Sequence, residues 1–280
     1  MTEPRILDTQ NITEVGLQPR AIGRVELQTK LRERTAIARL VQSGCLKLLF
    51  PQNSQHALEA VLLNTAGGIT GGDDLNVSAK VAANSALTLT TQAAERAYRA
   101  LKSQAGILTT AIKVGAAARL SWLPQETILF DGCNLSRHLK IDLDEDAQAL
   151  ICEPLVFGRR AMNERLSDAV FKDRIELTYR GHSLLYDATD LSGDVAGHLQ
   201  KPHIANGAGA VTFVAYFAPD AEGYLQRVRD LLPNSAGASL VRDRLLVARI
   251  LAPDSFELRK SLLPVLTLLN QAPLPRCWMI

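Results

Sequence analysis

This sequence has few cysteines and histidines, four and five, and they are not grouped as in known metal sites. Its four cysteines stand far apart and form no Cys-x-x-Cys pair: Cys45, Cys133, Cys152 and Cys277. A structural zinc site normally shows paired ligands at short spacing, so we interpret these cysteines as buried free thiols. Two short spacings remain candidates to hold an ion, His198 with His203 and Cys133 with His138. The alternative for both is a pair of ordinary loop or turn side chains.

A charge imbalance and long apolar runs are also missing. The 31 basic and 29 acidic residues give a formal net charge of +2, and no basic stripe is present, which argues against a nucleic-acid partner. The longest apolar stretches, such as 262–269, are far shorter than the roughly 20 residues that cross a bilayer. Residues 1–4 do not begin a secretory signal. We therefore expect a cytoplasmic protein without nucleic-acid or membrane partners.

The motifs of common enzyme classes are missing as well. The sequence contains no Gly-x-Ser-x-Gly elbow, no Gly-Lys-Ser/Thr phosphate loop, and no Gly-x-Gly-x-x-Gly turn between a strand and a helix. None of the histidines belongs to a known catalytic motif. These absences favour a protein that is not an enzyme.

A glycine-rich run is the most informative feature that is present. Residues 64–73 contain two glycine pairs and then an aspartate: Gly67, Gly68, Gly71, Gly72 and Asp73. Each glycine costs about 0.5–1 kcal/mol of conformational entropy relative to alanine, but it permits positive φ and close approach of other groups. An apolar run precedes the segment and an alternating run follows it, so we expect it to join two strands. It is either a tight turn of a β protein or a turn that faces a partner or lines a channel.

A repeated pattern indicates the fold. Residues 81–89, 114–122 and 143–152 each read as a strand, a short small-residue turn and a second strand, with a period of about 30 residues. Leu75, Val77 and Ala79 alternate with polar residues, as expected for half-buried strands. One such unit cannot bury its apolar face alone. We therefore predict a mainly β protein in which stacked β-hairpins form a solenoid-like body or a thick sandwich.

The remaining segments complete this prediction. Residues 21–29 and 36–40 read as strands. Two helices are expected in the C-terminal third, one after Asp220, which we expect to be its N-cap, and one opened by Asp254 and Ser255. The segment 193–209 reads as a long loop. No linker divides the chain, so we expect a single domain over residues 1–280, with a tail over residues 1–20.

Carboxylates gather in the best-defined segments of the sequence. They are Asp73, Glu126, Asp131, Glu153 and Glu164. A buried carboxylate is costly unless it is paired or binds a cation. Arginines that could pair with them lie nearby: Arg96, Arg99, Arg159 and Arg160. Structural ion pairs and a polar channel therefore both remain open as interpretations.

Five segments in this order resemble the urease accessory protein family UreD, also called UreH. The resemblance covers residues 23–278, and its segments are 64–73, 91–99 (TQAAERAYR), 122–132 (WLPQETILFDG), 153–164 (EPLVFGRRAMNE) and 274–278 (LPRCW). The sequence departs at Asn163, where the family usually has glycine. Asparagine tolerates a left-handed conformation better than most residues, so we expect the turn to be kept.

The resemblance implies a function that spacing alone does not give. Members of the family are non-enzymatic chaperone scaffolds for urease maturation that bind the urease apoprotein and UreF, and UreF in turn recruits UreG. It also implies nickel in transit and no tightly bound cofactor, with the five carboxylates as candidates to line the nickel path. Two alternatives remain: a carboxylate-dependent enzyme acting on a sugar or phosphate, and a plain β-solenoid binding module.

Overall fold

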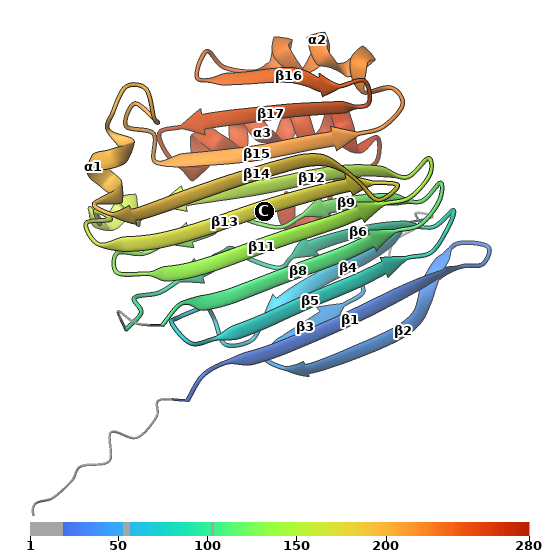
Figure 1. The fold of residues 1–280 in the computed structure, drawn as a ribbon, viewed down its shortest axis with the longest axis horizontal. Helices are drawn as coiled ribbons and strands as arrows, with labels where there is room; N and C mark the ends of the chain where they lie inside the picture. The colour runs from blue at the N-terminus through green and yellow to red at the C-terminus, as the bar shows by residue number, and fades with distance from the viewer. Residues whose placement is uncertain (1–18, 53–56, 102–103, 280) are drawn as a thin grey trace, which may run out of the picture.

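The structure of the chain is a computed structural model, and it describes residues 19–52, 57–101 and 104–279. Two β-sheets face each other (Figure 1). The first sheet has the order β14 (His182–Gly193), β13 (Ala169–Tyr179), β11 (Asn134–Leu143), β8 (Gly106–Val114), β5 (Asp74–Val81), β1 (Ile22–Leu31) and β2 (Thr35–Gly44). The predicted N-terminal tail, residues 1–20, lies outside the described residues except for Pro19 and Arg20.

The second sheet lies partly behind the first in Figure 1, and its C-terminal strands continue above it. Its order is β16 (Ala236–Arg242), β17 (Leu245–Ala252), β15 (Ala210–Phe217), β12 (Gln148–Phe157), β9 (Arg119–Leu123), β6 (Ala86–Thr91), β4 (Leu58–Asn64) and β3 (Leu46–Leu49). Two short strands, β7 (Glu95–Ala97) and β10 (Thr127–Leu129), extend it next to β12.

The solenoid-like stack is confirmed, but its repeating unit differs from a hairpin. From β5 to β13 the chain alternates between the two sheets, and each strand pairs in parallel with the equivalent strand of the next repeat. Thus β5 pairs with β8, and β6, which follows β5 directly, pairs with β4 and β9. Each small-residue turn is therefore an arch that carries the chain across the sandwich, where facing sheets lie about 10 Å apart.

The arches have the same backbone conformation in each repeat. They span residues 82–85, 115–118 and 144–147, and their third residues are left-handed: Asn84 (φ 58°), Ala117 (φ 52°) and Asp146 (φ 53°). Asparagine and aspartate suit this conformation because their side chains can bond locally, whereas alanine is strained there by about 1 kcal/mol. The predicted repeat is therefore also visible in the turn geometry.

Because the arches occupy one end of the sandwich, the longer connections lie together at the other end. These are residues 65–73, 92–101, 124–133 and 158–168. We call this the long-loop end; it is on the left in Figure 1. Four of the five segments that carry the family resemblance contribute to it.

The alternation of apolar and polar residues along the strands determines where the hydrophobic cores lie. Leu75, Val77 and Ala79 point into the main core between the sheets. A second core lies between the second sheet and two helices, α2 (Ala221–Leu231) and α3 (Ser255–Asn270), which confirms the two helices predicted for the C-terminal third. Within the described part of the chain, neither these nor any other helix is long and apolar enough to cross a membrane.

Two local expectations are corrected. The segment 193–209 is not entirely loop, because Val195–Leu199 forms the short helix α1, capped by the Asp194 side chain on the N–H of Gly197. Asp220 precedes α2 but makes no side-chain cap bond. Its carboxylate instead accepts a hydrogen bond from the Tyr216 hydroxyl. Asp254, which precedes α3, does cap its helix, since its side chain accepts from the N–H of Glu257.

Candidate functional site

Backbone pairing joins the motif segments at the long-loop end. β10 pairs in parallel with both β7 and β12, so residues near 96, 128 and 156 lie side by side. Isolated bridges connect Ile69 to Ala97 and Arg99 to Cys133. The fifth segment forms a 3-10 turn, Arg276–Trp278, from which the Trp278 indole N–H donates to the carbonyl of Leu123 at 2.9 Å. The fold thus brings together segments that are far apart in the sequence.

The four glycines of the first segment are required for different reasons. A Cβ on Gly68 would lie 2.3 Å from the Tyr98 ring, and one on Gly71 would lie 2.4 Å from the backbone oxygen of Gln104. Gly67 and Gly72 have φ of 79° and 87°, and a Cβ on Gly67 would meet open space. As predicted, the loop joins two strands, β4 and β5. It is also held close to the neighbouring 92–101 segment.

These differences predict a graded response to alanine. Gly71→Ala should lower the free energy of unfolding by about 2 kcal/mol or more, because a backbone oxygen cannot move away as a side chain can. Gly67→Ala is the matched control and should cost about 1 kcal/mol, the strain of a left-handed alanine. Urea unfolding of both variants is the measurement. Equal losses for the two variants would contradict the close approach at Gly71.

Asp73 ties this loop to the first strand. Its Oδ1 accepts from the N–H of Ala21 and its Oδ2 from the N–H of Thr70, both at 2.8 Å. The side chain is buried. Both oxygens are thus engaged by backbone donors, which gives Asp73 a structural task at the long-loop end.

Asp131 and Glu164 each form an ion pair at the long-loop end. Asp131 Oδ2 lies 2.7 Å from Arg99 Nη2, and Glu164 binds the Arg159 guanidinium with two contacts of 2.9 Å. Although partial burial raises the pKa of Asp131, hydrogen bonds from the N–H groups of Asp168 and Ser167 and from Arg99 hold it below its ordinary value. The hydrogen bonds from Arg159 likewise lower the pKa of Glu164. Both carboxylates are therefore ionised at neutral pH, and each pairs with one of the arginines named from the sequence.

Glu126 has a partner that sequence proximity did not suggest. Its Oε2 lies 3.4 Å from Nη2 of Arg259, a residue of α3. The same guanidinium stacks over the Trp278 ring, 5.2 Å from its centroid. Glu126 thus connects the long-loop end to the helical layer.

Glu153 belongs to a buried cluster that spans the two sheets. Arg137 Nη1, from β11, lies 2.6 Å from Glu153 Oε2, on β12. The same guanidinium binds Asp173, on β13, through contacts of 2.9 and 2.6 Å. Thr127 Oγ1 accepts from Arg137 at 3.1 Å, and the Trp122 indole donates to Glu153 at 2.6 Å. One guanidinium therefore holds together two carboxylates inside the sandwich.

The charges in this cluster are unequal. Burial alone would lower the pKa of Arg137, but Asp173 and Glu153 hold it above its ordinary value, so the guanidinium is charged. Burial raises the pKa of Glu153 more than the Arg137 charge lowers it. The cluster contains two carboxyl groups for one guanidinium, so a cation beside Glu153 would favour the ionised form of that carboxyl.

Sequence reasoning named Glu153 but missed Arg137 and Asp173. A signal was available, since Arg137 stands in the inward register between Leu135 and Leu139 of β11. Asp173 is likewise inward-facing on β13. Glu95 was also missed. It accepts from the Asn64 side chain at 3.2 Å, and burial raises its pKa.

The structure does not support the two residue pairs that were candidates to bind an ion. Cys133 is buried while His138, on the outer face of β11, contacts Glu176 at 3.1 Å, so the two do not meet. Burial raises the pKa of the Cys133 thiol to about 11. His198, in α1, and His203 are both exposed. Among the described residues, no group of three or more His, Cys, Asp or Glu side chains is placed to hold a metal ion.

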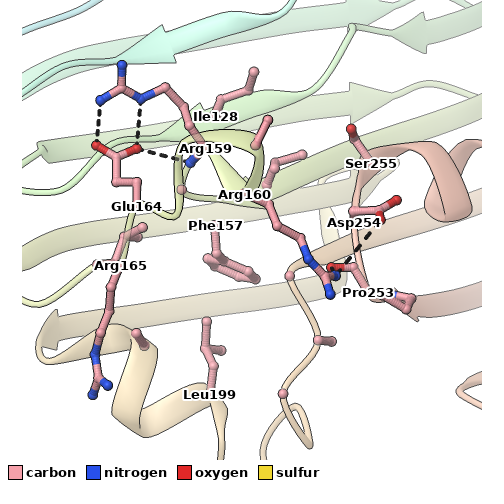
Figure 2. Close-up of a pocket in the computed structure, with 18 of the residues that line it drawn as sticks. Ile128, Phe157, Arg159, Arg160, Glu164, Arg165, Leu199, Pro253, Asp254 and Ser255 are labelled. Atoms are coloured by element: carbon pink, nitrogen blue, oxygen red, sulfur yellow. Dashed lines mark hydrogen bonds and ion pairs between the residues drawn. The ribbon is translucent and has the colours of Figure 1, made fainter.

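A pocket of about 840 Å³ opens at the long-loop end beside the Arg159–Glu164 pair (Figure 2). Its walls come from the 158–166 connection, from 196–209 and from the start of α3. No sequence signal indicated this hollow.

Comparisons with known proteins agree with the segments described above. A family model described as "UreD urease accessory protein" matches residues 21–279. A urease accessory protein UreD of Ruegeria pomeroyi is 55% identical over 257 residues, 91% of this chain and 100% of the relative. Proteins of the same name from Rhizobium leguminosarum and Agrobacterium fabrum are 42% and 39% identical. These alignments cover 92% and 93% of this chain, and 95% and 92% of the relatives.

Proposed function

Because this chain belongs to the UreD urease accessory protein family, we propose that it is a scaffold that binds the urease apoprotein and UreF, with UreG joining through UreF, and that it assists nickel insertion. The observation that carries this proposal is the family match over residues 21–279. The chain acts in urease maturation and is not an enzyme, so the alternative of a sugar- or phosphate-converting enzyme falls away. We place this role in the cytoplasm.

We further propose that nickel is cargo and passes along carboxylates. Oxygen ligands hold nickel less tightly than histidine or thiolate clusters do, which suits a path that must release its ion. Two kinds of carboxylate support the idea. Asp131 and Glu164 are ionised at the long-loop end, and Glu153 is buried between the sheets. Asp73 and Glu126 lie in the same set of loops.

The test is a strain from which this gene is deleted. We expect its urease subunits to be made and assembled but to lack nickel, so that activity falls to background. Nickel analysis and activity assays of the purified urease measure this, and the gene restored on a plasmid is the control. A fully nickel-loaded, active urease from the deletion strain would overturn the proposal.

A further inference from the structure

The pocket at the long-loop end has an apolar floor. Phe157, at the end of β12, lines it together with Ile128, Val156, Leu166 and Leu199. A hollow of about 840 Å³ is within the usual range for ligand sites, and such sites are mostly apolar with a few placed polar groups. The floor can therefore bury apolar side chains of an incoming group.

Large apolar side chains also remain exposed around the opening. Phe256, in the first turn of α3, lines the pocket and is 65% exposed. Met162 is 69% exposed and lies in the turn that contributes Ala161 and Asn163 to the wall. Aromatic and methionine side chains are enriched in protein interfaces. An occupant that covered both residues would have to extend beyond the cavity, which a small molecule confined to it does not do.

The rim exposes more positive than negative charge. Three arginines each pair with a carboxylate, and in each pair the arginine is the more exposed partner. The side-chain exposures are 46% for Arg159 against 13% for Glu164, 65% for Arg160 against 38% for Asp254, and 63% for Arg165 against 52% for Asp194. Lys260, whose ammonium lies 4.5 Å from the centre of the Phe256 ring, likewise pairs with Glu257 at 2.8 Å and is the more exposed partner, 57% against 45%. Figure 2 shows Arg159 and Arg160 extending from the same turn.

We propose that this arginine-rimmed pocket is a docking site for a protein segment that inserts an aromatic or long aliphatic side chain flanked by carboxylates. The apolar floor and Phe256 would receive the side chain, and the exposed guanidiniums would bind the flanking carboxylates, because arginine donates to carboxylates in a fixed fork. Arg160 uses one nitrogen on the carbonyl of Pro253 and keeps other donors. That the docked segment belongs to a maturation protein rests on the proposed scaffold function.

The test uses two synthetic fluorescent peptides of the same length with a Phe-Leu centre. One carries Asp and Glu on both sides and the other carries Lys and Arg. We expect fluorescence anisotropy with the full chain to show the acidic peptide binding at least about tenfold more tightly than the basic one, because the rim charge favours it. Equal binding of the two peptides, or no binding of the acidic one up to about 1 mM, would overturn the proposal.

Variants of the full chain locate the binding. Phe256→Ser and Arg160→Glu should each weaken the acidic peptide about tenfold or more, as expected at interface hot spots. Tyr186→Ser, at a residue of β14 that is 58% exposed and does not line the pocket, is the matched control and should bind as the wild type does. Unchanged thermal midpoints show that the variants fold. Unchanged binding by both pocket variants would contradict the site.

Two further results separate the competing explanations. If replacing Ile6 and Leu7 by serine in the full chain tightens acidic-peptide binding tenfold, the occupant is this chain's own N-terminal segment and the proposal is wrong. In cells, Phe256→Ser should reduce urease activation while Tyr186→Ser does not. Peptide binding is measured without urease, so an active urease in the deletion strain would remove the scaffold function but leave the docking result standing.

Discussion

Arg137→Met should lower the free energy of unfolding by about 3–5 kcal/mol, the usual cost of leaving a buried charge without its partner. Glu153 and Asp173 are only 5% and 8% exposed, and this one guanidinium is the positive charge that both contact. Methionine keeps much of the volume but supplies neither the charge nor the donors. Urea unfolding measures the loss, and we also expect less soluble protein.

A triple variant provides the control for this prediction. Combining Arg137→Met with Glu153→Gln and Asp173→Asn removes all three charges together, so no ion is left unpaired. Replacing a complete buried ion cluster with hydrophobic residues of similar volume is often neutral or stabilising. Because the amides leave no buried ion unpaired but must still bury their N–H groups, the triple variant should regain part of the lost stability. If Arg137→Met alone is as stable as the triple variant, the cluster does not hold the two sheets together as its geometry indicates.

The fold was largely predictable because its strands repeat a simple pattern. Alternation at Leu75, Val77 and Ala79 identifies strands, and the small-residue turns mark where the chain reverses. Whether the two strands beside a turn pair with each other is a different question. β5 pairs with β1 and with β8 of the next repeat, and not with β6, which follows it across the turn. A local pattern contains no information on that choice, which is why hairpins were predicted where arches occur.

The partners of the carboxylates were predictable only where both residues lie in the segments that carry the resemblance, as Asp131 and Arg99 do. Glu164 lies five residues from Arg159, and the two pair. Glu153 pairs with Arg137 of the opposite sheet, and Glu126 pairs with Arg259 of a helix more than a hundred residues away. Phe256 was not singled out from the sequence, because its exposure follows from where the start of α3 lies beside the pocket.

Glu153→Gln should separate a nickel path from a purely structural role. The amide keeps the volume and can still accept from the Trp122 indole. Arg137 keeps both of its contacts with Asp173, so one positive and one negative charge remain and no ion is left unpaired. We therefore expect pull-downs with urease and UreF to give wild-type amounts of complex, in contrast to Arg137→Met.

Nickel delivery by the same variant should fall. A unit charge about 4 Å away contributes on the order of 4 kcal/mol per unit of cation charge at an effective dielectric constant near 20, before desolvation is counted. Losing it should reduce the nickel content of urease at least about tenfold. Glu176→Gln, on the outer face of the first sheet beside His138, is the matched control and should leave nickel content unchanged. A Glu153→Gln protein that loads urease fully, or that loses complex and nickel together, would leave Glu153 with a structural role and remove it from the path.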